Sequence, residues 1–457
     1  LALGPTRIMV TGTYDIPVVR YAAAAVVTNT APMGACRGAG RPEAAELVER
    51  MMDIAALEME VDPVALRLRN VLPPFTEPVR TAMGTVYDTG DYAKALEEAV
   101  RLAGYAELRA EQAARRAAGA RWQLGIGIGI YVEVTARGNA SELGAVEVHG
   151  DGAVTVRAGT SSHGQGHATA FSMIVADTLG IPLERIRYVQ SDTAAVPRGG
   201  GTGGSRSLQL GGNAVLKAAE AVLDRARSVA AAKLEAAAED IVVHPGQGLG
   251  VAGVPSTAIS WGELSVMAAN DGPRPGAAAP DGAPTEGGPL AVELDFNQGD
   301  ATFPFGAHVS VVEVDTETGQ AKMLRHVTVD DAGPVLNPVL AEGQRHGGIA
   351  QGAAQALFEE VLYDADGNPL TSTLADYAAI SAPDLPSFEL AASETPTDLN
   401  PLGAKGIGEA GTIGSTPAIQ NAVIDAVSHL GVRHIDMPAT PQRVWTAINA
   451  ARKASNQ

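Results

Sequence analysis

A single carboxylate stands out in the sequence because of its glycine-rich surroundings. The stretch GAKGIGEAGTIG, residues 403–414, holds Glu409 among five glycines and one lysine. Glycine costs folding entropy, so a cluster of glycines indicates tight backbone geometry or close approach to something bulky. The alternative is a flexible surface loop, because turns are where glycine is usually found. The stretch therefore has two interpretations. Its main chain approaches a bulky ligand closely, with Glu409 beside that ligand, or it is an ordinary surface loop.

Three further segments share this design of glycine-rich backbone, one or two polar side chains and a helix directly afterwards. They are GACRGAGR, TSSHGQGHAT and GGTGGSRS, at residues 34–41, 160–169 and 200–207. Exposed N–H groups at helix N-termini bind anions, and glycines let a large ligand lie against the main chain. Good phosphate partners in these segments are Arg37, Thr202, Ser205, Arg206 and Ser207. Because there is no P-loop and no Rossmann fingerprint, the segments predict a large phosphorylated cofactor held by loops from several places.

Other reactive side chains have simpler interpretations. His163 and His167 have a spacing that suits a metal site on a helix, but no third ligand is obvious, which favours hydrogen-bonded or exposed histidines. Cys36 is more typical of a buried small hydrophobe than of a nucleophile. The pair Asp330–Asp331 stands before Gly-Pro and is interpreted as a turn feature, and Lys405 as a structural ion-pair partner.

Composition and charge exclude several classes of protein. With 457 residues, 46% of them apolar, the chain can form two or more domains. Its net charge of −19 argues against nucleic acid or an anionic membrane as the main partner. No run approaches the ~18 uninterrupted apolar residues that a membrane helix needs, so no integral membrane segment is expected.

The presence of a single cysteine limits which cellular compartment and which cysteine-ligated cofactors are compatible with this chain. One cysteine excludes an internal disulfide and a cysteine-ligated zinc or iron–sulfur site within the chain. It fits a cytosolic protein, so we expect a cytoplasmic location, and the N-terminus lacks the charged and apolar regions of a signal peptide. Because the chain has no initiator methionine and runs straight into strand-like sequence, we expect the later part of a longer polypeptide or a processed subunit.

Periodicity and capping residues predict the elements of the first third of the chain. Residues 41–60 predict a helix with Pro42 in its first turn, where a missing N–H is harmless. A second helix is predicted at 90–105 with Asp91 as N-cap, and 106–121 as its exposed end or a connector. GIGIGIYVEV (125–134) looks like a nucleotide loop, but its alternation fits a tightly packed strand better.

Two β-hairpins are predicted, each followed by a loop that enters a helix. Residues 144–160 alternate on either side of Gly-Asp-Gly, and 308–333 turn at Thr-Gly. The loops that follow contain Gly and Gln, with Gln165 and Gln351 near the loop-to-helix junctions. This recurrence predicts two related halves that face one cleft.

The remaining segments complete the expected organisation. We expect a short strand in 185–192, a long Ala-rich helix that ends near residue 239, and a surface loop or domain boundary at 270–290. The 403–414 stretch is expected to run into a helix with Pro417 in its first turn, and a last helix follows at 440–453.

Five segments together resemble the large, molybdenum-binding subunit of the xanthine dehydrogenase / aldehyde oxidase / aerobic carbon monoxide dehydrogenase family. They occur in family order and cover essentially the whole chain, at residues 28–44, 159–182, 201–215, 330–360 and 400–426. The resemblance implies a molybdenum hydroxylase, a metal-binding oxidoreductase. Its cofactor would be molybdopterin cytosine dinucleotide carrying molybdenum with oxo, sulfido and hydroxo ligands. No direct protein ligand to the metal is expected, because the pterin dithiolene holds it.

The resemblance also implies roles for individual residues. Glu409 corresponds to the general base that takes the proton from the metal-bound hydroxyl while an electron-poor carbon is attacked. The implied cofactor-binding residues are Arg37 and Gly38 beside the molybdenum, Gly164, Gln165 and Gly166 at the pterin, Thr202, Gly203, Gly204, Ser205, Arg206 and Ser207 in a further loop, Gln351 near the pterin or metal ligands, and Gly408 before the base.

The sequence departs from two branches of the family. Carbon monoxide dehydrogenases carry a copper-binding Cys directly after the loop arginine, where this chain has Gly38, and Cys36 lies on the other side of Arg37. Purine-oxidising members place a Phe two residues after that arginine, where this chain has Ala39. We therefore expect hydroxylation of an N-heteroaromatic compound or an aldehyde, with water as the oxygen source. The alternatives are a carbon monoxide dehydrogenase-like subunit and a non-catalytic assembly subunit that keeps the fold.

The expected fold is α+β, with several mixed domains whose hairpins and Gly-rich loops enter helices. Residues 1–120 would be the remainder of a first molybdopterin-binding domain and 121–457 a second, with related halves 121–265 and 300–457 joined by 266–299. The family's N-terminal region has no counterpart here. Expected partners in a heteromeric complex are therefore a [2Fe-2S] subunit, an FAD-binding subunit, and a chain or segment that carries the missing N-terminal part, besides a small-molecule substrate.

Overall fold

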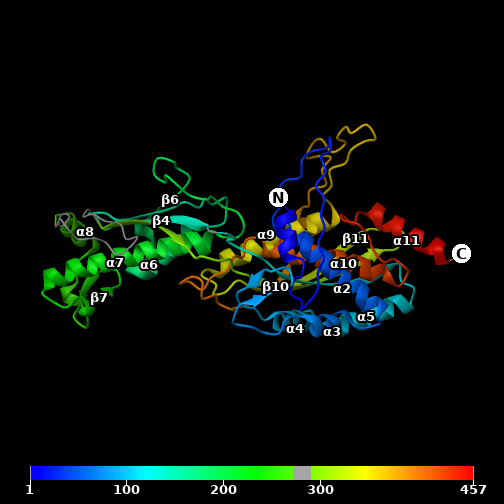
Figure 1. The fold of residues 1–457 in the computed structure, drawn as a ribbon, viewed down its shortest axis with the longest axis horizontal. Helices are drawn as coiled ribbons and strands as arrows, with labels where there is room; N and C mark the ends of the chain where they lie inside the picture. Colours follow the sequence, from blue (N-terminus) through cyan, green and yellow to red (C-terminus); the bar gives the residue numbers. More distant parts are fainter. Residues whose placement is uncertain (1, 139, 271–289, 456–457) are drawn as a thin grey trace. The chain divides into compact units, whose positions relative to one another are not determined.

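The chain forms two compact units in the computed structural model, which describes residues 2–138, 140–270 and 290–455 (Figure 1). The first unit comprises residues 1–135, 302–397 and 405–457, and the second comprises 136–301 and 398–404. The two units are defined by the compactness of the structure. The boundary predicted at 120/121 is instead based on the resemblance to family domains, and it stays a prediction. The predicted linker 266–299 is too long, because a helix reaches Asn270 and a strand begins at Ala291, and residues 271–289 lie outside the described residues.

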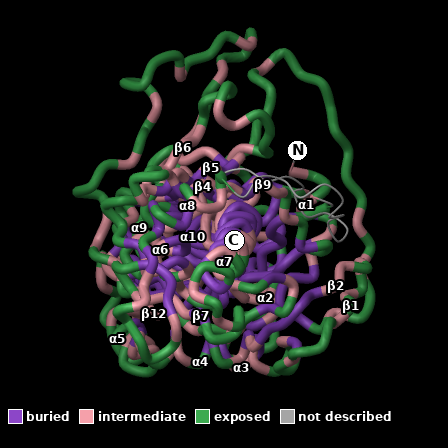
Figure 2. The backbone as a smooth tube through the Cα atoms, turned by 90° about the vertical axis from the view of Figure 1, so that its left-hand side faces the viewer, coloured by how far each residue is buried: buried purple, intermediate pink, exposed green. Residues whose placement is uncertain are grey.

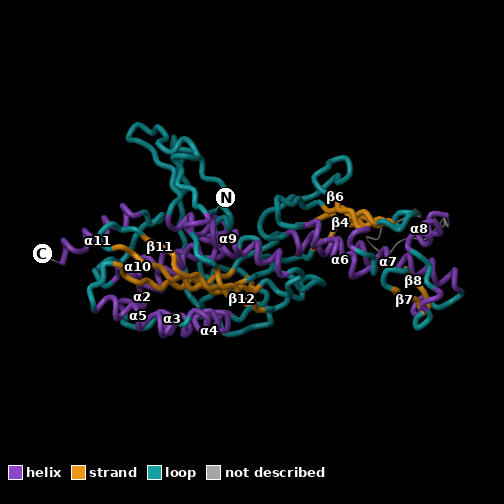
Figure 3. Tube along the Cα trace, turned by 180° about the vertical axis from the view of Figure 1, so that it is seen from behind, coloured by secondary structure: helices purple, strands orange, loops and turns teal. Residues whose placement is uncertain are grey.

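The first unit is built on a four-stranded sheet. Its strand order is β12-β11-β10-β3, with bounds Phe388–Ser393, Ala321–Asp331, Phe305–Asp315 and Trp122–Val132. Strands β10 and β11 form the predicted hairpin, whose register shifts at Val311/Val312, and β12 runs parallel to β11. Figure 3 shows these strands as one twisted group.

Strand β3 packs its glycine face against the backbone of helix α10 (Ala410–Ser428). A Cβ atom on Gly125 would lie 1.9 Å from the Ala422 carbonyl oxygen, and one on Gly127 would lie 2.0 Å from that of Ala418. Only glycine therefore fits on this side of the strand, while its isoleucines are buried on the other. The expectation of a tightly packed strand rather than a nucleotide loop is confirmed.

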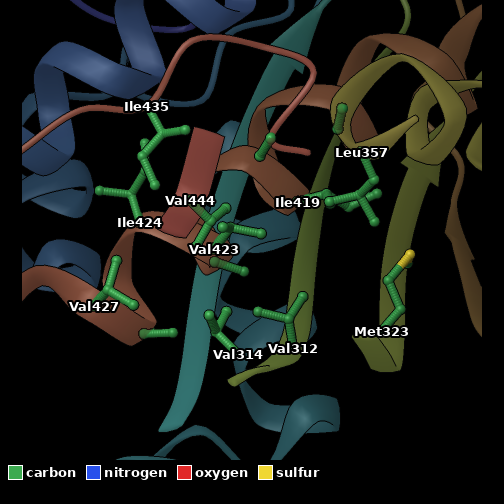
Figure 4. Packing of buried hydrophobic residues seen from close by; sticks show 14 of the residues in the cluster. Val312, Val314, Met323, Leu357, Ile419, Val423, Ile424, Val427, Ile435 and Val444 are labelled. Atoms are coloured by element: carbon green, nitrogen blue, oxygen red, sulfur yellow. The ribbon is translucent and has the colours of Figure 1, made fainter. Parts of the chain in front are cut away.

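Helix α10 is the core of the first unit. Val312 and Val314 of β10 pack in one cluster with Ile419 and Val423 of α10 and Val444 of α11 (Pro441–Ser455) (Figure 4). The last predicted helix is thus confirmed as α11. The expectation of a helix that starts near Pro417 is wrong, because α10 already begins at Ala410 and Pro417 lies inside it.

Helix α9 (Pro338–Leu357) crosses α10 at almost direct backbone contact. A Cβ on Gly348 would lie 2.9 Å from the Gly411 Cα, and one on Gly352 would lie 2.0 Å from the Ser415 hydroxyl. The helix starts at the Asn337 cap, earlier than expected. Gln351 is therefore inside the helix and not at a loop-to-helix junction.

The N-terminal helices complete the first unit. Helix α2 (Arg41–Glu58) starts where predicted, with the Glu43 side chain accepting a hydrogen bond from the Gly40 N–H. Asp91 caps α4 (Tyr92–Ala103) as predicted, and residues 106–121 mostly form a separate helix, α5 (Tyr105–Ala117), after left-handed Gly104. The other elements are α1 (Leu3–Met9), α3 (Pro63–Asn70), β1 (Val79–Arg80) and β2 (Val86–Tyr87).

The second unit has its own four-stranded sheet, in the order β6-β5-β4-β9. Its strands are Ile186–Val189, Val154–Ala158, Ser141–Val148 and Ala291–Asn297, and β4 with β5 forms the other predicted hairpin. Helix α6 (His167–Leu179) and the long helix α7 (Asn213–Leu234) pack on this sheet. Helix α7 ends at left-handed Glu235, before the predicted residue 239. A π-helical turn, η2 (Ser207–Gly212), precedes it, and β7 (Ile241–His244), β8 (Gly248–Val251) and α8 (Trp261–Asn270) follow.

One connectivity occurs in both units. Each has an antiparallel hairpin, a helix, a strand parallel to the second hairpin strand, and then a long helix: β4-β5-α6-β6-α7 and β10-β11-α9-β12-α10. In each sheet an antiparallel strand, β9 or β3, lies on the other edge of the hairpin. The order matches the predicted relationship between two halves, which stays a prediction. The mixed α/β architecture with several sheets is as expected.

Candidate active site

Glu409 is the N-cap residue of α10 in the first unit. Two of the five motif glycines, Gly411 and Gly414, lie inside this helix and serve its packing: a Cβ on Gly411 would lie 2.6 Å from the Arg345 carbonyl oxygen, and one on Gly414 would lie 2.6 Å from the His308 ring. The stretch 403–414 is therefore half loop and half helix. The helix N-terminus supplies a positive potential at the carboxylate.

Both oxygens of Glu409 are held. The Gly38 N–H donates to Oε1 at 2.9 Å, and Arg41 Nη2 donates to Oε2 at 2.9 Å. The Glu409 side chain keeps 13% of its surface exposed, whereas the Arg41 side chain is buried. Charge-assisted bonds of this kind fix a carboxylate in orientation. Glu409 is thus an oriented acid that retains access to a ligand.

Arg41 ties three parts of the first unit together. Its guanidinium donates to the Gly38 carbonyl oxygen at 2.8 Å and to that of Val134 at 3.0 Å, and it lies 3.4 Å from the buried Glu133 carboxylate. The planar fork of arginine suits several simultaneous acceptors better than an ammonium does. Arg41 therefore links the start of α2, the end of β3 and Glu409.

The loop before α2 has a backbone that strongly favours glycine. Gly38 has φ +104°, and a Cβ there would lie 2.5 Å from the Pro42 ring. Ala39 and Gly40 also have positive φ, at 39° and 96°. This run turns the Gly38 N–H toward Glu409. Any side chain at residue 38 would be strained.

Arg37 spans from this loop to α9 and to the residue before the acid. Its Nε donates to the Gly408 carbonyl oxygen at 2.5 Å, and Nη2 donates to the Gln344 carbonyl oxygen and side-chain oxygen at 3.0 and 3.2 Å. Burial lowers the pKa of Arg37, and the charges of Glu409 and Glu133 oppose that shift. Arg37 thus fastens the loop on which Gly38 presents its N–H.

Gln351 lies across from Cys36. The Gln351 amide nitrogen is 3.5 Å from the Cys36 sulfur, and Cys36 is exposed. The expectation of a buried hydrophobic cysteine is therefore wrong. The structure brings Arg37, Gly38, Gln351, Gly408 and Glu409 together within the first unit.

The other predicted binding residues gather in two loops of the second unit. The loops meet at Gly159 and Gly199, where a Cβ on Gly199 would lie 2.2 Å from the Gly159 carbonyl oxygen. The Thr160 hydroxyl is 3.0 Å from that of Thr202 and 2.7 Å from that of Ser207. The hydroxyls of 160–162 and 202–207 therefore form one polar cluster at the carboxyl ends of β5 and β6.

The geometry of these loops fits an anionic ligand. Gly164 and Gly166 have φ values of 112° and 80°, and Gly166 is the N-cap of α6 without a side-chain cap. Space lies open within 4 Å of a Cβ on Gly164 or Gly203. The Arg206 guanidinium bonds the Gly200 carbonyl oxygen, and its buried Nε has no hydrogen-bond partner among the described residues. Open main chain, hydroxyls and a guanidinium are the donors that a dinucleotide phosphate needs.

Gln165 and the two histidines of this segment have different surroundings. The Gln165 side-chain oxygen accepts from the Ser162 hydroxyl at 3.3 Å, so it braces its own loop. His167 stacks on Phe171 at 5.2 Å, and burial, with the charge of His163, lowers the pKa of His167 to about 4. Within the described part of the chain, no group of three or more His, Cys, Asp or Glu side chains is arranged to hold a metal ion.

Lys405, four residues before Glu409 in sequence, has a structural role. Its ammonium donates to the Thr89 hydroxyl at 2.6 Å and lies 3.8 Å from the Asp88 carboxylate. Burial lowers the pKa of Lys405, opposed by Asp88. The interpretation of Lys405 as a structural partner agrees with this geometry.

A chain of buried, hydrogen-bonded polar side chains, here called the buried relay, was not predicted from the sequence. The Ser310 hydroxyl, His326, His308 and the Asp330 carboxylate follow one another at 2.8, 3.0 and 3.0 Å, and the Tyr131 hydroxyl donates to Asp330 at 2.8 Å. The turn interpretation of Asp330 is wrong, because this side chain is fully buried in the sheet. Burial would raise the pKa of Asp330, but His308 and its other partners hold it at about 2.

Within the second unit, the glycine-rich, hydroxyl-bearing loops are typical of a class of protein that holds a large anionic cofactor. Comparison with known families agrees. Residues 98–386 and 4–71 match two families described as molybdopterin cofactor-binding domain. The chain belongs to the molybdopterin cofactor-binding domain family, as found in large subunits of molybdenum hydroxylases, which confirms the resemblance.

Similar proteins carry related names. The carbon monoxide dehydrogenase large chain of Hydrogenophaga pseudoflava is 37% identical over 96% of this chain and 55% of its own length. The nicotine 6-hydroxylase large subunit of Paenarthrobacter nicotinovorans is 35% identical, over 96% and 53%. The chain spans about half the length of these relatives.

Solved structures share the fold. The quinoline 2-oxidoreductase of Pseudomonas putida 86 superposes with a TM-score of 0.88 at 33% identity, covering 98% of this chain and 57% of that one. A Cu,Mo-CO dehydrogenase gives the same TM-score and identity, over 97% and 57%. The expected fold class is therefore confirmed. No helix among the described residues has the length and apolarity to cross a membrane.

Proposed function

We propose that this chain is the cofactor-binding part of a molybdenum hydroxylase that oxidises an N-heteroaromatic compound or an aldehyde, with oxygen from water. The observation that carries the proposal is Glu409, whose two oxygens are oriented by the Gly38 N–H and by Arg41 while its side chain stays partly exposed. A structural carboxylate would instead be closed off, as Glu133 is.

The residues fit molybdopterin cytosine dinucleotide. The N-terminus of α6 with Gly164, Gln165 and Gly166, and the loop from Thr202 to Ser207, would hold its phosphates and pterin. Gln351 would approach the pterin or the metal ligands. When bound, the cofactor supplies an oxygen nucleophile and accepts the two electrons of the oxidation.

Glu409 is the group of this chain that moves a proton. Its oriented carboxylate takes a proton from the attacking oxygen, which makes that oxygen a better nucleophile. The Gly38 N–H and Arg41 keep the acceptor oxygens in place, so little reorganisation is needed during transfer. Arg37 acts indirectly. Its Nε donates to the Gly408 carbonyl oxygen and so holds in place the residue that precedes Glu409.

Oxidation of carbon monoxide is the rival within the family, and the loop geometry favours the hydroxylase. Gly38 stands where the copper-binding Cys would be, and a side chain there would meet the Pro42 ring at 2.5 Å with φ at +104°. Cys36 is the chain's only cysteine and lies 3.5 Å from the Gln351 amide. Ala39 likewise offers no ring to stack on a purine.

The proposal extends to partners and location. The single cysteine cannot hold an iron–sulfur cluster, so electrons would leave through [2Fe-2S] and FAD centres on partner subunits. A chain or segment beyond these residues would carry the region that the relatives have outside the match. A cytoplasmic location remains our prediction.

Replacing the acid tests the function. We expect Glu409→Gln to lower kcat/KM by at least about 10³-fold, with molybdenum content unchanged, because the amide cannot accept the proton. Turnover of quinoline, nicotine and benzaldehyde by the purified enzyme, with an artificial electron acceptor, is the measurement. Glu313→Gln is the control, since that carboxylate is 21% exposed in the same unit and pairs with Arg115. Unchanged turnover in Glu409→Gln would overturn the catalytic role.

A further inference from the structure

A second carboxylate shares the arginine that orients Glu409. Arg41 Nη2 lies 2.9 Å from Glu409 Oε2 and 3.4 Å from Glu133 Oε1. Glu133 directly follows strand β3, and its main-chain N–H donates to the Pro304 carbonyl oxygen at 2.8 Å. All four residues belong to the first unit. One guanidinium nitrogen therefore stands between two carboxylates, and one of these is the proposed base.

The two carboxylates differ in how far they are buried. The Glu133 side chain is fully buried, whereas the Glu409 side chain stays partly exposed. Helix α10, which Glu409 caps, is itself buried along nearly all of its length, and Figure 2 draws this part of the chain as buried. Because Glu133 is closed off from any ligand, it can influence the reaction only through its neighbours.

Four charged side chains gather at the start of α10. Arg37 is the fourth, and its Nε donates to the Gly408 carbonyl oxygen at 2.5 Å. Burial lowers the pKa of Arg37, and the charges of Glu409 and Glu133 both oppose that shift. The two guanidinium groups of Arg37 and Arg41 are thus balanced by two carboxylates. If Glu133 were neutral, Glu409 alone would face two positive charges.

Other charged groups around the start of α10 pair with one another. Arg345 of α9 lies 3.5 Å from the Asp330 carboxylate of β11, and His308 of β10 lies 3.0 Å from the same carboxylate. Lys405, in the loop before α10, lies 3.8 Å from Asp88. Among the described residues, the two guanidinium groups and the buried carboxylate named above are therefore the charges that act most directly on the acid.

A carboxylate that faces only guanidinium groups is a weak base. A nearby positive charge favours the ionised carboxylate and lowers its affinity for a proton, whereas a second carboxylate close by raises that affinity. General bases work best when this affinity suits the working pH. An arginine that orients a base therefore also weakens it, unless another negative charge offsets the arginine.

We propose that Glu133 is a positioning residue for the proposed reaction: through Arg41, it preserves the proton affinity of Glu409. Arg41 fixes the orientation of the Glu409 carboxylate, and Glu133 supplies the negative charge that offsets the guanidinium. The shared nitrogen and the complete burial of Glu133 carry this assignment, because a buried charge is little screened by solvent. The inference rests on the proposed function, since it takes Glu409 as the base.

The pH profile of the enzyme purified with its natural partners tests the proposal. We expect Glu133→Gln to move the acidic limb of kcat/KM down by about one pH unit, because a nearby negative charge is lost. The limb is measured with whichever of quinoline, nicotine and benzaldehyde is turned over fastest. Glu133→Asp keeps the charge and should keep the limb near its wild-type position.

Glu49→Gln is the matched control for this profile. The Glu49 carboxylate is equally buried and lies 2.8 Å from the Arg67 Nε in the same unit. Its loss removes a buried ion pair without touching Arg41, so the acidic limb should stay in place. An unmoved limb in Glu133→Gln would overturn the proposal, as would an equal shift in Glu49→Gln.

Infrared titration gives a result that needs no turnover. The difference between spectra recorded with and without the Glu409→Gln substitution isolates the protonated Glu409 carboxyl group. In the wild type we expect it to lose its proton near the pH at which glutamate in a short peptide does, and about one pH unit lower in Glu133→Gln. A wild-type midpoint more than about one pH unit below that of the peptide would overturn the proposal.

The two measurements separate this proposal from the proposed function. If turnover survived in Glu409→Gln, the catalytic role of the acid would fail. The infrared midpoints would still show whether Glu133 raises the proton affinity of Glu409.

Discussion

The catalytic proposal depends at the residue scale on how Glu409 is oriented, and Arg41 is the side chain that sequence reasoning overlooked. The segment 34–41 was singled out for Arg37, whereas the last residue of that segment makes the charged contact with the acid. Its importance comes from three acceptors that converge from loop, strand and helix. No spacing rule reveals such convergence, because two of the three acceptors lie about 90 and 370 residues away in sequence.

Arg41→Lys tests this orientation. The lysine ammonium keeps the positive charge but cannot donate hydrogen bonds to the Gly38 and Val134 carbonyl oxygens and the Glu409 carboxylate at the same time. We therefore expect kcat to fall about tenfold at unchanged molybdenum content. The control is Arg101→Lys, an exposed arginine paired with Glu98, which should leave kcat unchanged. Equal kcat in Arg41→Lys and wild type would show that the acid needs no such support.

The buried relay predicts how stability depends on pH. Burial, together with the charge of His308, holds the pKa of His326 well below its usual value, although Asp330 opposes this. The unfolded chain takes up a proton near pH 6.5 while the folded chain does not, so stability falls as the pH drops below about 6.5.

Urea unfolding at pH 7.5 and 5.5 measures this dependence. Between these values we expect His326 to account for a loss of about 1 kcal/mol, which disappears in His326→Gln. His434→Gln, at a histidine that is 43% exposed, should keep the wild-type difference. A pH dependence unaltered by His326→Gln would contradict the account of the relay.

Elements were predictable where pattern and chemistry agreed. The alternation of residue types along the chain predicted both hairpins and the glycine-rich strand β3. Residues typical of helix starts predicted α2 and α4. The start of α10 was misplaced because Gly411 and Gly414 look like loop glycines in sequence. Their role is to let α10 approach α9 and His308, which depends on contacts across the fold.

Gly411→Ala tests this helix crossing. The added methyl group would lie 2.6 Å from the Arg345 carbonyl oxygen and 2.9 Å from the Ile349 nitrogen, so the helices must separate. We expect a loss of about 1–3 kcal/mol, visible as a lower Tm. Gly343→Ala in α9 is the matched control, because its Cβ meets nothing within 4 Å and alanine favours a helix. Equal effects of the two substitutions would refute the packing role.

At the scale of the whole molecule, the resemblance predicted more than the residues alone could. The four glycine-rich segments that precede helices indicated a large phosphorylated cofactor, and only the family segments indicated molybdenum. The repeated β-β-α-β-α order accounts for where the candidate residues lie, because 202–207 precede α7 in the second unit and 405–409 precede α10 in the first. Neither the compact units nor the exposure of most residues of 17–36 could be foreseen, since both depend on which segments pack together.

The most direct test of the central claim is the metal and nucleotide content of the enzyme purified with its natural partners. We predict about one molybdenum atom per chain, and about one cytosine nucleotide released on acid hydrolysis, since the loops of the second unit suit a dinucleotide. Arg206→Ala should lower both contents together. A fully assembled enzyme with neither molybdenum nor a pterin nucleotide would contradict the account.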